Sequence, residues 1–163
     1  MRSYAPVGPP GGSLLGGAPT TFVVGLSARA GAVFGSTGPF FYSQAFTVGG
    51  TQYGEQLRGY DEFSITPNGF NPNADQNQAS VSSFGNAFFV GTGEFGLRVN
   101  QSLYLNTFFE GGNVWNKPRE FDPTRLFRTA GVGVATLSPR GPLGVGVGSG
   151  LDKIDAQGLQ APG

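Results

Sequence analysis

The sequence has 163 residues and equal numbers of basic and acidic side chains, 10 of each, so it has no net charge that would attract nucleic acid. It contains no Cys and no His, which excludes disulfides, thiolate nucleophiles, His general bases and the usual zinc ligand sets. With 29 Gly and 15 Phe but one Met, the composition favours strands and tight turns over helices. We therefore expect an all-β protein that is not an enzyme and has no cofactor or metal.

Two segments at the start of the chain differ in pattern. Residues 1–20 are dense in Gly and Pro and predict a loop, and they lack the apolar core of a secretory signal, so we interpret the sequence as a fragment that begins within a larger protein. Residues 21–49 predict two strands. From Phe22 to Phe34 apolar and small side chains occupy every second position, and a short turn then leads into a second alternating strand at about 39–49.

The next segment, residues 50–83, is rich in Asn, Gln, Gly and Pro and predicts a long loop. A loop of this length is uncommon unless it has a function. Residues 84–151 then predict four strands in which apolar side chains alternate with polar side chains or glycine, at 85–99, 102–115, 126–137 and 143–151. Residues 152–163 predict a last, truncated loop.

The predicted connections alternate between short turns and long loops. This arrangement is typical of outer-membrane β-barrels, which have short turns on the periplasmic side and longer extracellular loops. The strands at 85–99 and 102–115 also exceed the ~5–6 residues that are usual in soluble sheets. We therefore predict a single domain, residues 1–163, that forms part of an antiparallel transmembrane β-barrel. A soluble β-sandwich, whose strands also alternate, is the alternative.

Four sets of motifs follow one another along the chain. They are Gly49-Gly50 with Arg58-Gly59-Tyr60, then Gly93-Glu94-Phe95, then Phe108-Phe109-Glu110-Gly111-Gly112-Asn113-Val114-Trp115, and last Gly131-Val132-Gly133 with Ser138-Pro139-Arg140-Gly141-Pro142-Leu143. An Arg-Gly-Tyr tripeptide alone has little specificity. In this order, however, the motifs resemble those of the BamA family of barrel assembly factors and transporters, the bacterial surface antigen family, over nearly the whole chain.

The resemblance implies where the strands belong in a larger barrel. The six predicted strands correspond to the tenth to fifteenth of a sixteen-stranded barrel. The chain would then be a C-terminal barrel fragment that lacks the earlier strands, the final strand and the periplasmic POTRA domains. The motif residues expected to support the loop site are Gly49, Gly50, Gly111, Trp115, Pro139, Gly141 and Pro142.

The resemblance also implies a contact between the long loop and the barrel wall. In the family this loop folds back into the lumen, and its Arg reaches acidic residues on the inner wall. Alternation places Glu94 and Glu110 on the polar faces of adjacent strands, so both can point into the lumen. We expect Arg58 to pair with one or both, because a guanidinium group suits carboxylates. Gly59 would permit close backbone approach or a positive φ, and Tyr60 would pack its ring against the wall and keep its hydroxyl for a hydrogen bond.

The function implied by the resemblance is the folding and insertion of β-barrel proteins into the bacterial outer membrane, without covalent chemistry. The expected partners are outer-membrane lipids, client β-barrel proteins and lipoproteins of an assembly complex. A related exporter, such as a two-partner secretion transporter or the translocation and assembly module barrel, shares the loop motif and is the first alternative. The others are a soluble β-sandwich binding module and, for the site alone, a solvated Arg58 beside carboxylates that only coat the lumen.

Overall fold

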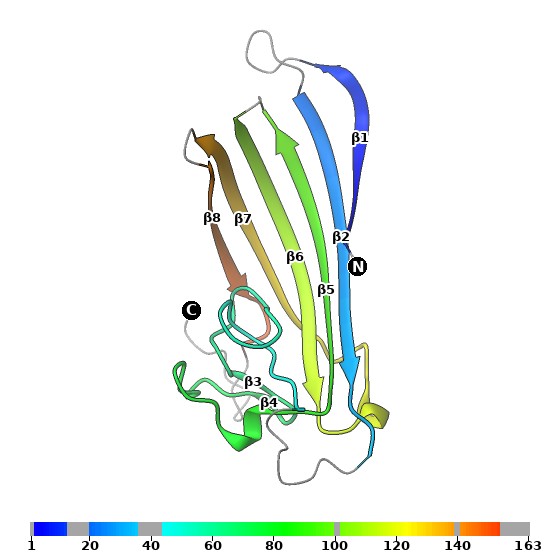
Figure 1. Cartoon of the computed structure of the whole chain (residues 1–163), viewed down its shortest axis with the longest axis vertical. Helices are drawn as coiled ribbons and strands as arrows, with labels where there is room; N and C mark the ends of the chain where they lie inside the picture. Colours follow the sequence, from blue (N-terminus) through cyan, green and yellow to red (C-terminus); the bar gives the residue numbers. More distant parts are fainter. Residues whose placement is uncertain (1, 13–19, 36–43, 100–101, 139–140, 154–163) are drawn as a thin grey trace.

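The computed structural model describes residues 2–12, 20–35, 44–99, 102–138 and 141–153, and its main element is one antiparallel sheet of six strands (Figure 1). In spatial order the strands are β1 (Arg2–Gly12), β2 (Thr20–Ala32), β5 (Ala87–Arg98), β6 (Leu103–Trp115), β7 (Phe127–Ser138) and β8 (Gly141–Gly150). The connection between β2 and β5 carries β3 (Ile65–Thr66), β4 (Gly69–Phe70) and the 3-10 helix η2 (Val81–Ser83), and η3 (Pro118–Glu120) follows β6. No helix within these ranges is long and apolar enough to cross a membrane.

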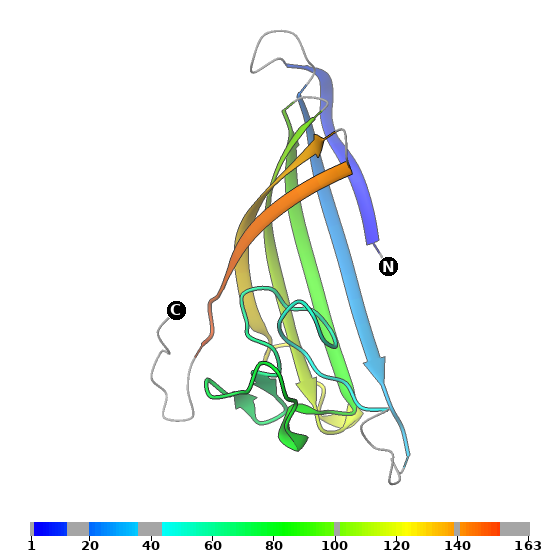
Figure 2. The same ribbon diagram turned by 60° about the vertical axis from the view of Figure 1, so that its left-hand side comes forward.

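The sheet has the shape of a piece of barrel wall. Figure 2 shows long strands in a curved sheet, with β8 turning over the side on which the β2–β5 connection lies. Neighbouring strands stay in antiparallel register over most of their length, as in the ladder from Thr21↔Arg98 to Ala32↔Ala87. A β-sandwich needs a second sheet packed face to face against the first, and in the described part of the chain the only other sheet is the short pair β3–β4. The prediction of a partial antiparallel β-barrel is confirmed, and the sandwich alternative is excluded.

The prediction of a loop over residues 1–20 is wrong for its first part. Arg2–Gly12 forms β1, which pairs with β2 from Arg2↔Ser27 to Gly12↔Thr20, with a register shift between Val7 and Gly12. The prolines that predicted a loop are compatible with this position, because β1 is the edge of the sheet and proline is tolerated where a strand has a neighbour on one side only.

The second strand predicted at about 39–49 is also not found over residues 44–49, the part of it that the structure describes. Residues 36–43 lie outside the described ranges, and residues 44–49 form only isolated bridges, such as Phe46↔Gly85 and Val48↔Ile65. The chain turns away from the sheet here, since Gly49 and Gly50 have φ values of 126° and 64°. Instead, β5 pairs with β2. The sheet still has six strands, the number predicted, because β1, which was predicted as part of a loop, adds one.

The two faces of the sheet differ as the alternation predicts. On one face, large apolar side chains remain exposed on β2, β5, β6, β7 and β8, namely Phe22, Leu26, Phe95, Leu105, Phe109, Val132, Val134, Leu143, Val145 and Val147. This is the face that meets lipid hydrocarbon in a membrane barrel. The opposite face has polar side chains on β5 and β6 and glycine at every second position of β8.

The β2–β5 connection covers one end of the polar face (Figures 1 and 2). It contacts strands toward both edges of the sheet, because Glu55 pairs with Arg29 of β2 and Gly59 hydrogen-bonds to Gly150 of β8. Its apolar side chains form a core with the sheet, made of Val48, Leu57, Tyr60, Ile65, Phe70, Phe88, Val90 and Val114. The connection is ordered because it buries apolar side chains of its own.

Candidate functional site

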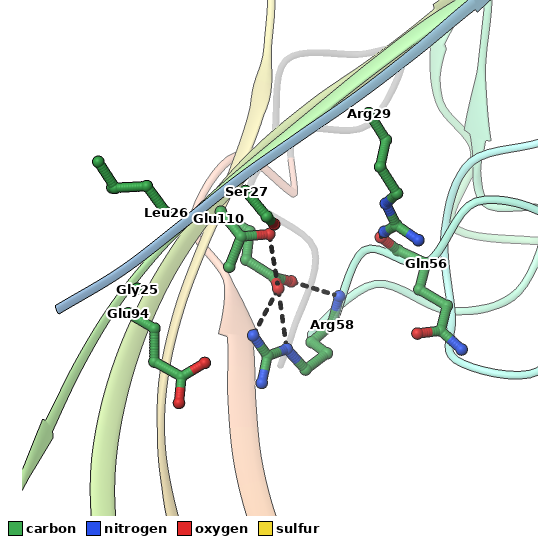
Figure 3. Close-up of a pocket in the computed structure, with 9 residues that line it drawn as sticks. Gly25, Leu26, Ser27, Arg29, Gln56, Arg58, Glu94 and Glu110 are labelled. Carbon is green, nitrogen blue, oxygen red and sulfur yellow. Dashed lines mark hydrogen bonds and ion pairs between the residues drawn. The ribbon is translucent and has the colours of Figure 1, made fainter. Parts of the chain in front are cut away.

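Arg58 of the long connection is bound to Glu110 of β6 (Figure 3). The guanidinium donates from Nε at 2.9 Å and from Nη2 at 2.5 Å to the same carboxylate oxygen, Oε1. The second oxygen, Oε2, accepts the backbone N–H of Arg58 at 3.0 Å. The Glu110 side chain is 7% exposed and that of Arg58 is 35% exposed, so the pair lies at the edge of the buried region. Glu110 therefore fixes both the side chain and the backbone of Arg58.

An aromatic ring supports the guanidinium group from the side. Cζ of Arg58 lies 3.5 Å from the centroid of the buried Phe108 ring, which is the geometry of a cation–π interaction. A Cβ at Gly131 of β7 would overlap this ring, and one at Gly148 of β8 would lie 2.9 Å from it. These two glycines therefore make room for the ring on which Arg58 rests. The sequence pattern does not single out Phe108, although its place two residues before Glu110 puts both on one face.

Gly59 has both properties expected of it. Its φ is 85°, and a Cβ would lie 2.6 Å from Oγ1 of Thr129 and 2.8 Å from the backbone N of Gly150. Its carbonyl accepts the N–H of Gly150 at 3.0 Å. The connection thus makes a backbone contact with β8 directly beside the Arg58 site.

Tyr60 is almost fully buried and links the connection to the ends of β7 and β8. Its hydroxyl donates to the carbonyl of Arg128 and accepts the N–H of Asp152, both at 3.1 Å. Its ring packs edge-on against Phe70 and Phe127. Burial is the main cause that raises the pKa of Tyr60 to about 12.

Beside Tyr60, Arg128 and Asp152 form a second ion pair. The carboxylate of Asp152 accepts the backbone N–H of Arg128 at 2.8 Å and its guanidinium N–H groups at 2.9 and 2.6 Å. These hydrogen bonds lower the pKa of Asp152 below its ordinary value. No spacing in the sequence predicts this pair, because it depends on how the chain leaves β8.

Glu94, the other expected partner of Arg58, makes no ion pair with it in the part of the chain that the structure describes. Its Oε1 accepts hydrogen bonds from Tyr104 at 3.2 Å and from Asn106 at 2.8 Å, both on β6. Glu94 faces Phe108 across the β5–β6 ladder and therefore lies two residue pairs farther from the connection than Glu110, which faces Thr92. Of the two carboxylates, the structure brings Glu110 alone to Arg58.

The glycine pair Gly49-Gly50 shapes the start of the connection. Both residues have positive φ, and a Cβ at Gly50 would overlap the carboxylate of Glu62. Glu62 is itself buried and was missed by sequence analysis, because nothing in the local pattern distinguishes it from the exposed Asp61 beside it.

The remaining motif residues lie away from Arg58 or outside the described ranges. Gly111 belongs to the outward face, and buried Trp115 packs edge-on against a ring of the following loop at 4.9 Å between centroids. Gly141 has a φ of 126° at the start of β8, and the backbone of Pro142 pairs with β7. Pro139 lies outside the described residues. Of those that the structure describes in full, it brings none of Gly111, Trp115 and Gly141 to the Arg58 pair.

The surroundings of the pair form a polar hollow of about 190 Å³ between the connection and the sheet (Figure 3). Arg29, Gln56, Thr92 and the two carboxylates of β5 and β6 line it. No group of three or more His, Cys, Asp or Glu side chains suited to a metal ion occurs among the described residues. What the arrangement does chemically is to hold a loop against the inside of a barrel wall.

Comparison with known proteins identifies the wall and its loop as parts of one domain. The Omp85 superfamily domain matches residues 4–160, which is nearly the whole chain. A comparison with curated proteins found no match. The family match supports a role in the assembly or secretion of outer-membrane proteins, and the chain belongs to the Omp85 superfamily.

Proposed function

We propose that this protein is a BamA-like assembly factor of the bacterial outer membrane, which folds and inserts β-barrel proteins and catalyses no covalent reaction. The observation that carries the proposal is the Arg58–Glu110 pair, which fastens a long loop to the inner face of the sheet. A loop held in this way stabilises the barrel wall, and the Omp85 match supports an outer-membrane role for it.

The loop braces the wall across several strands. Its contacts include an ion pair from Glu55 to Arg29 of β2 at 3.3 Å, the Arg58 pair on β6 and the backbone contact of Gly59 with β8. Strands that are not neighbours in the sheet are thereby tied to one another from inside. When the bilayer or a client strains such a barrel, the barrel opens at its seam, where the first and last strands meet, and not within this wall.

An open seam is a surface on which another strand can pair. Exposed strand edges present unpaired N–H and C=O groups and act as templates for an incoming strand, which is a hazard in most sheets. In an assembly factor this edge is the working surface for client β-barrel proteins. The apolar outward face meets the outer-membrane lipids, and lipoproteins of an assembly complex would be further partners.

The experiment replaces the cellular protein with its full-length Arg58→Ala variant and measures two products. One is the amount of folded client barrels in the outer membrane, and the other is the amount of secreted protein. An assembly factor loses the first product, whereas an exporter loses the second while barrels remain normal, which would reject the proposal. Arg119→Ala, at an exposed position in η3, is the matched control and leaves both products unchanged.

A further inference from the structure

We propose that Glu62 is the positioning residue of the loop, whose buried carboxylate folds the segment around Arg58 and so presents Arg58 to Glu110. The inference concerns how the loop is built. Only its consequence in the cell rests on the proposed function.

The carboxylate of Glu62 is held by three consecutive backbone N–H groups. Oε1 accepts from Thr51 at 2.6 Å and from Gln52 at 2.7 Å, and Oε2 accepts from Tyr53 at 3.3 Å. The residue is 9% exposed. Successive N–H groups that converge on one anion form an anion-binding nest, and charge-assisted hydrogen bonds of this kind are about twice as strong as neutral ones.

Backbone N–H groups are the partners that the structure gives this charge. None of the ion pairs in the described residues includes Glu62, although a buried carboxylate is costly unless it is compensated. Glu55 of the same loop, in contrast, pairs with Arg29. Glu62 is therefore bound by the loop itself and not by the barrel wall.

The nest is connected directly to both sides of Arg58. Gly50, which precedes the three donors, donates its N–H to the carbonyl of Tyr60 at 3.0 Å and accepts the N–H of Leu57 at 3.1 Å. Arg58 lies between these two bonded residues. The position of Gly50 is set in turn by Glu62, because Gly50 has a φ of 64° and passes so close to the carboxylate that a Cβ would overlap it. Glu62 thus acts on Arg58 through Gly50.

Cleavage by trypsin measures directly how the Glu62 carboxylate affects the segment around Arg58. Arg58 is the only Lys or Arg between Arg29 and Arg98, so cleavage in this part of the chain occurs at one bond. Its neighbours Leu57 and Tyr60 are 0% and 4% exposed, so the protease reaches the bond only when the loop opens.

The experiment follows cleavage at Arg58 in the whole protein in outer-membrane vesicles. Glu62→Gln keeps the length of the side chain and removes its charge. It should raise the cleavage rate about tenfold, because a neutral amide oxygen accepts weaker hydrogen bonds than a carboxylate. Glu62→Asp keeps the charge and should stay closer to the parent than Glu62→Gln. Glu120→Gln, at an exposed position, should match the parent.

The relative cleavage rates of the two Glu62 variants show whether the charge or the packing of this side chain holds the loop. The inference is overturned if Glu62→Gln is cleaved at Arg58 as slowly as the parent, or if Glu62→Asp is cleaved faster than Glu62→Gln. In either case the shape of the side chain, and not its charge, would hold the loop.

A second pair of variants approaches the nest from Gly50. Gly50→Ala places a Cβ on the carboxylate and should also expose Arg58, whereas Gly69→Ala, which has a φ of 127° and open space around it, should not. Equal cleavage in these two variants overturns the inference even if Glu62→Gln fails to fold.

Failure of this inference and failure of the proposed function give different results. If Glu62→Gln exposes Arg58 to trypsin while client barrels assemble normally, the nest is supported and the proposed function fails. If Arg58→Ala blocks assembly while Glu62→Gln leaves the bond protected, the inference fails and the proposed function stands.

Discussion

Glu110 and Glu94 lie on adjacent strands and on the same face of the sheet, but they have different environments. Glu110 is buried under the long connection and binds Arg58 through three N–H donors. Glu94 is partly exposed and accepts hydrogen bonds from Tyr104 and Asn106 of the neighbouring strand. The two residues are the same chemically, so their roles are decided by which part of the wall the loop covers.

The same division holds for the whole inner face. At the covered end, apolar side chains of the connection and the sheet share a core, and the carboxylate there is neutralised by a cation. At the uncovered end, Glu94 is partly exposed and accepts hydrogen bonds from neutral groups, so its charge needs no cation as a partner. The comparison shows that a carboxylate becomes a structural partner where burial makes an unpaired charge costly.

The largest expected effect is that of Glu110→Ala. It leaves the Arg58 guanidinium and a backbone N–H without their acceptor, and we expect a loss of about 2–4 kcal/mol in the free energy of unfolding, since removing one member of a buried ion pair strands the other. Urea unfolding in lipid vesicles measures it. If Glu94→Ala costs as much, the distinction between the two carboxylates is wrong.

Gly59→Ala should come next. The added Cβ meets Thr129 and the backbone of Gly150, and the residue must keep a φ of 85°, so we expect a cost of about 1–3 kcal/mol from overpacking and backbone strain. Gly69→Ala is the control, because it also has positive φ but no atom near the new Cβ. Equal costs would mean that strain, and not the contact with β8, explains the effect.

The Arg128–Asp152 pair is an exposed counterpart of the Arg58 site and should respond to pH. Hydrogen bonds from Arg128 lower the pKa of Asp152, so the pair stabilises the fold fully above the ordinary carboxyl pKa of about 4 and loses this contribution as the pH falls through the lower folded value. We expect the difference in unfolding free energy between the parent and Asp152→Asn to be present at about pH 6 and to shrink below about pH 4. A constant difference over this range would contradict the assignment.

The smallest effect is expected for Glu94→Gln. Both hydrogen bonds to Glu94 reach one oxygen, Oε1, and an amide oxygen can accept them equally well. We expect a change within about 0.5 kcal/mol, as for most exposed substitutions. Unfolding in urea, with Glu110→Gln in parallel, checks it, and a large cost at Glu94 would show that its charge is needed after all.

The parts of the fold that depend on alternation can be predicted from the sequence. A period of two assigns side chains to faces without knowledge of the neighbours, and in the structure Glu94 and Glu110 share the face opposite the exposed apolar side chains. Prediction from sequence fails where position in the sheet overrides local composition. Arg2–Gly12 reads as a loop, yet it forms an edge strand, where proline is tolerated.

The site was predictable in outline and not in detail. The motif order predicted that Arg58 would meet an acidic residue, but the choice of Glu110 depends on how far the loop reaches along the sheet. Phe108, Glu62 and the Arg128–Asp152 pair depend on contacts between segments distant in the chain. No spacing rule connects such residues before the loop is folded.

The most direct test of the account exchanges the charges of the loop and the wall in the full-length protein. Arg58→Glu and Glu110→Arg are made singly and together, and Arg58→Glu is also combined with Glu94→Arg. Heat-modifiable gel migration and assembly of client barrels are measured for each. We expect each single reversal to impair both properties, and we expect Glu110→Arg, but not Glu94→Arg, to restore them in part to Arg58→Glu. Single variants that fold and assemble clients like the parent, or equal rescue by both wall variants, would contradict this expectation.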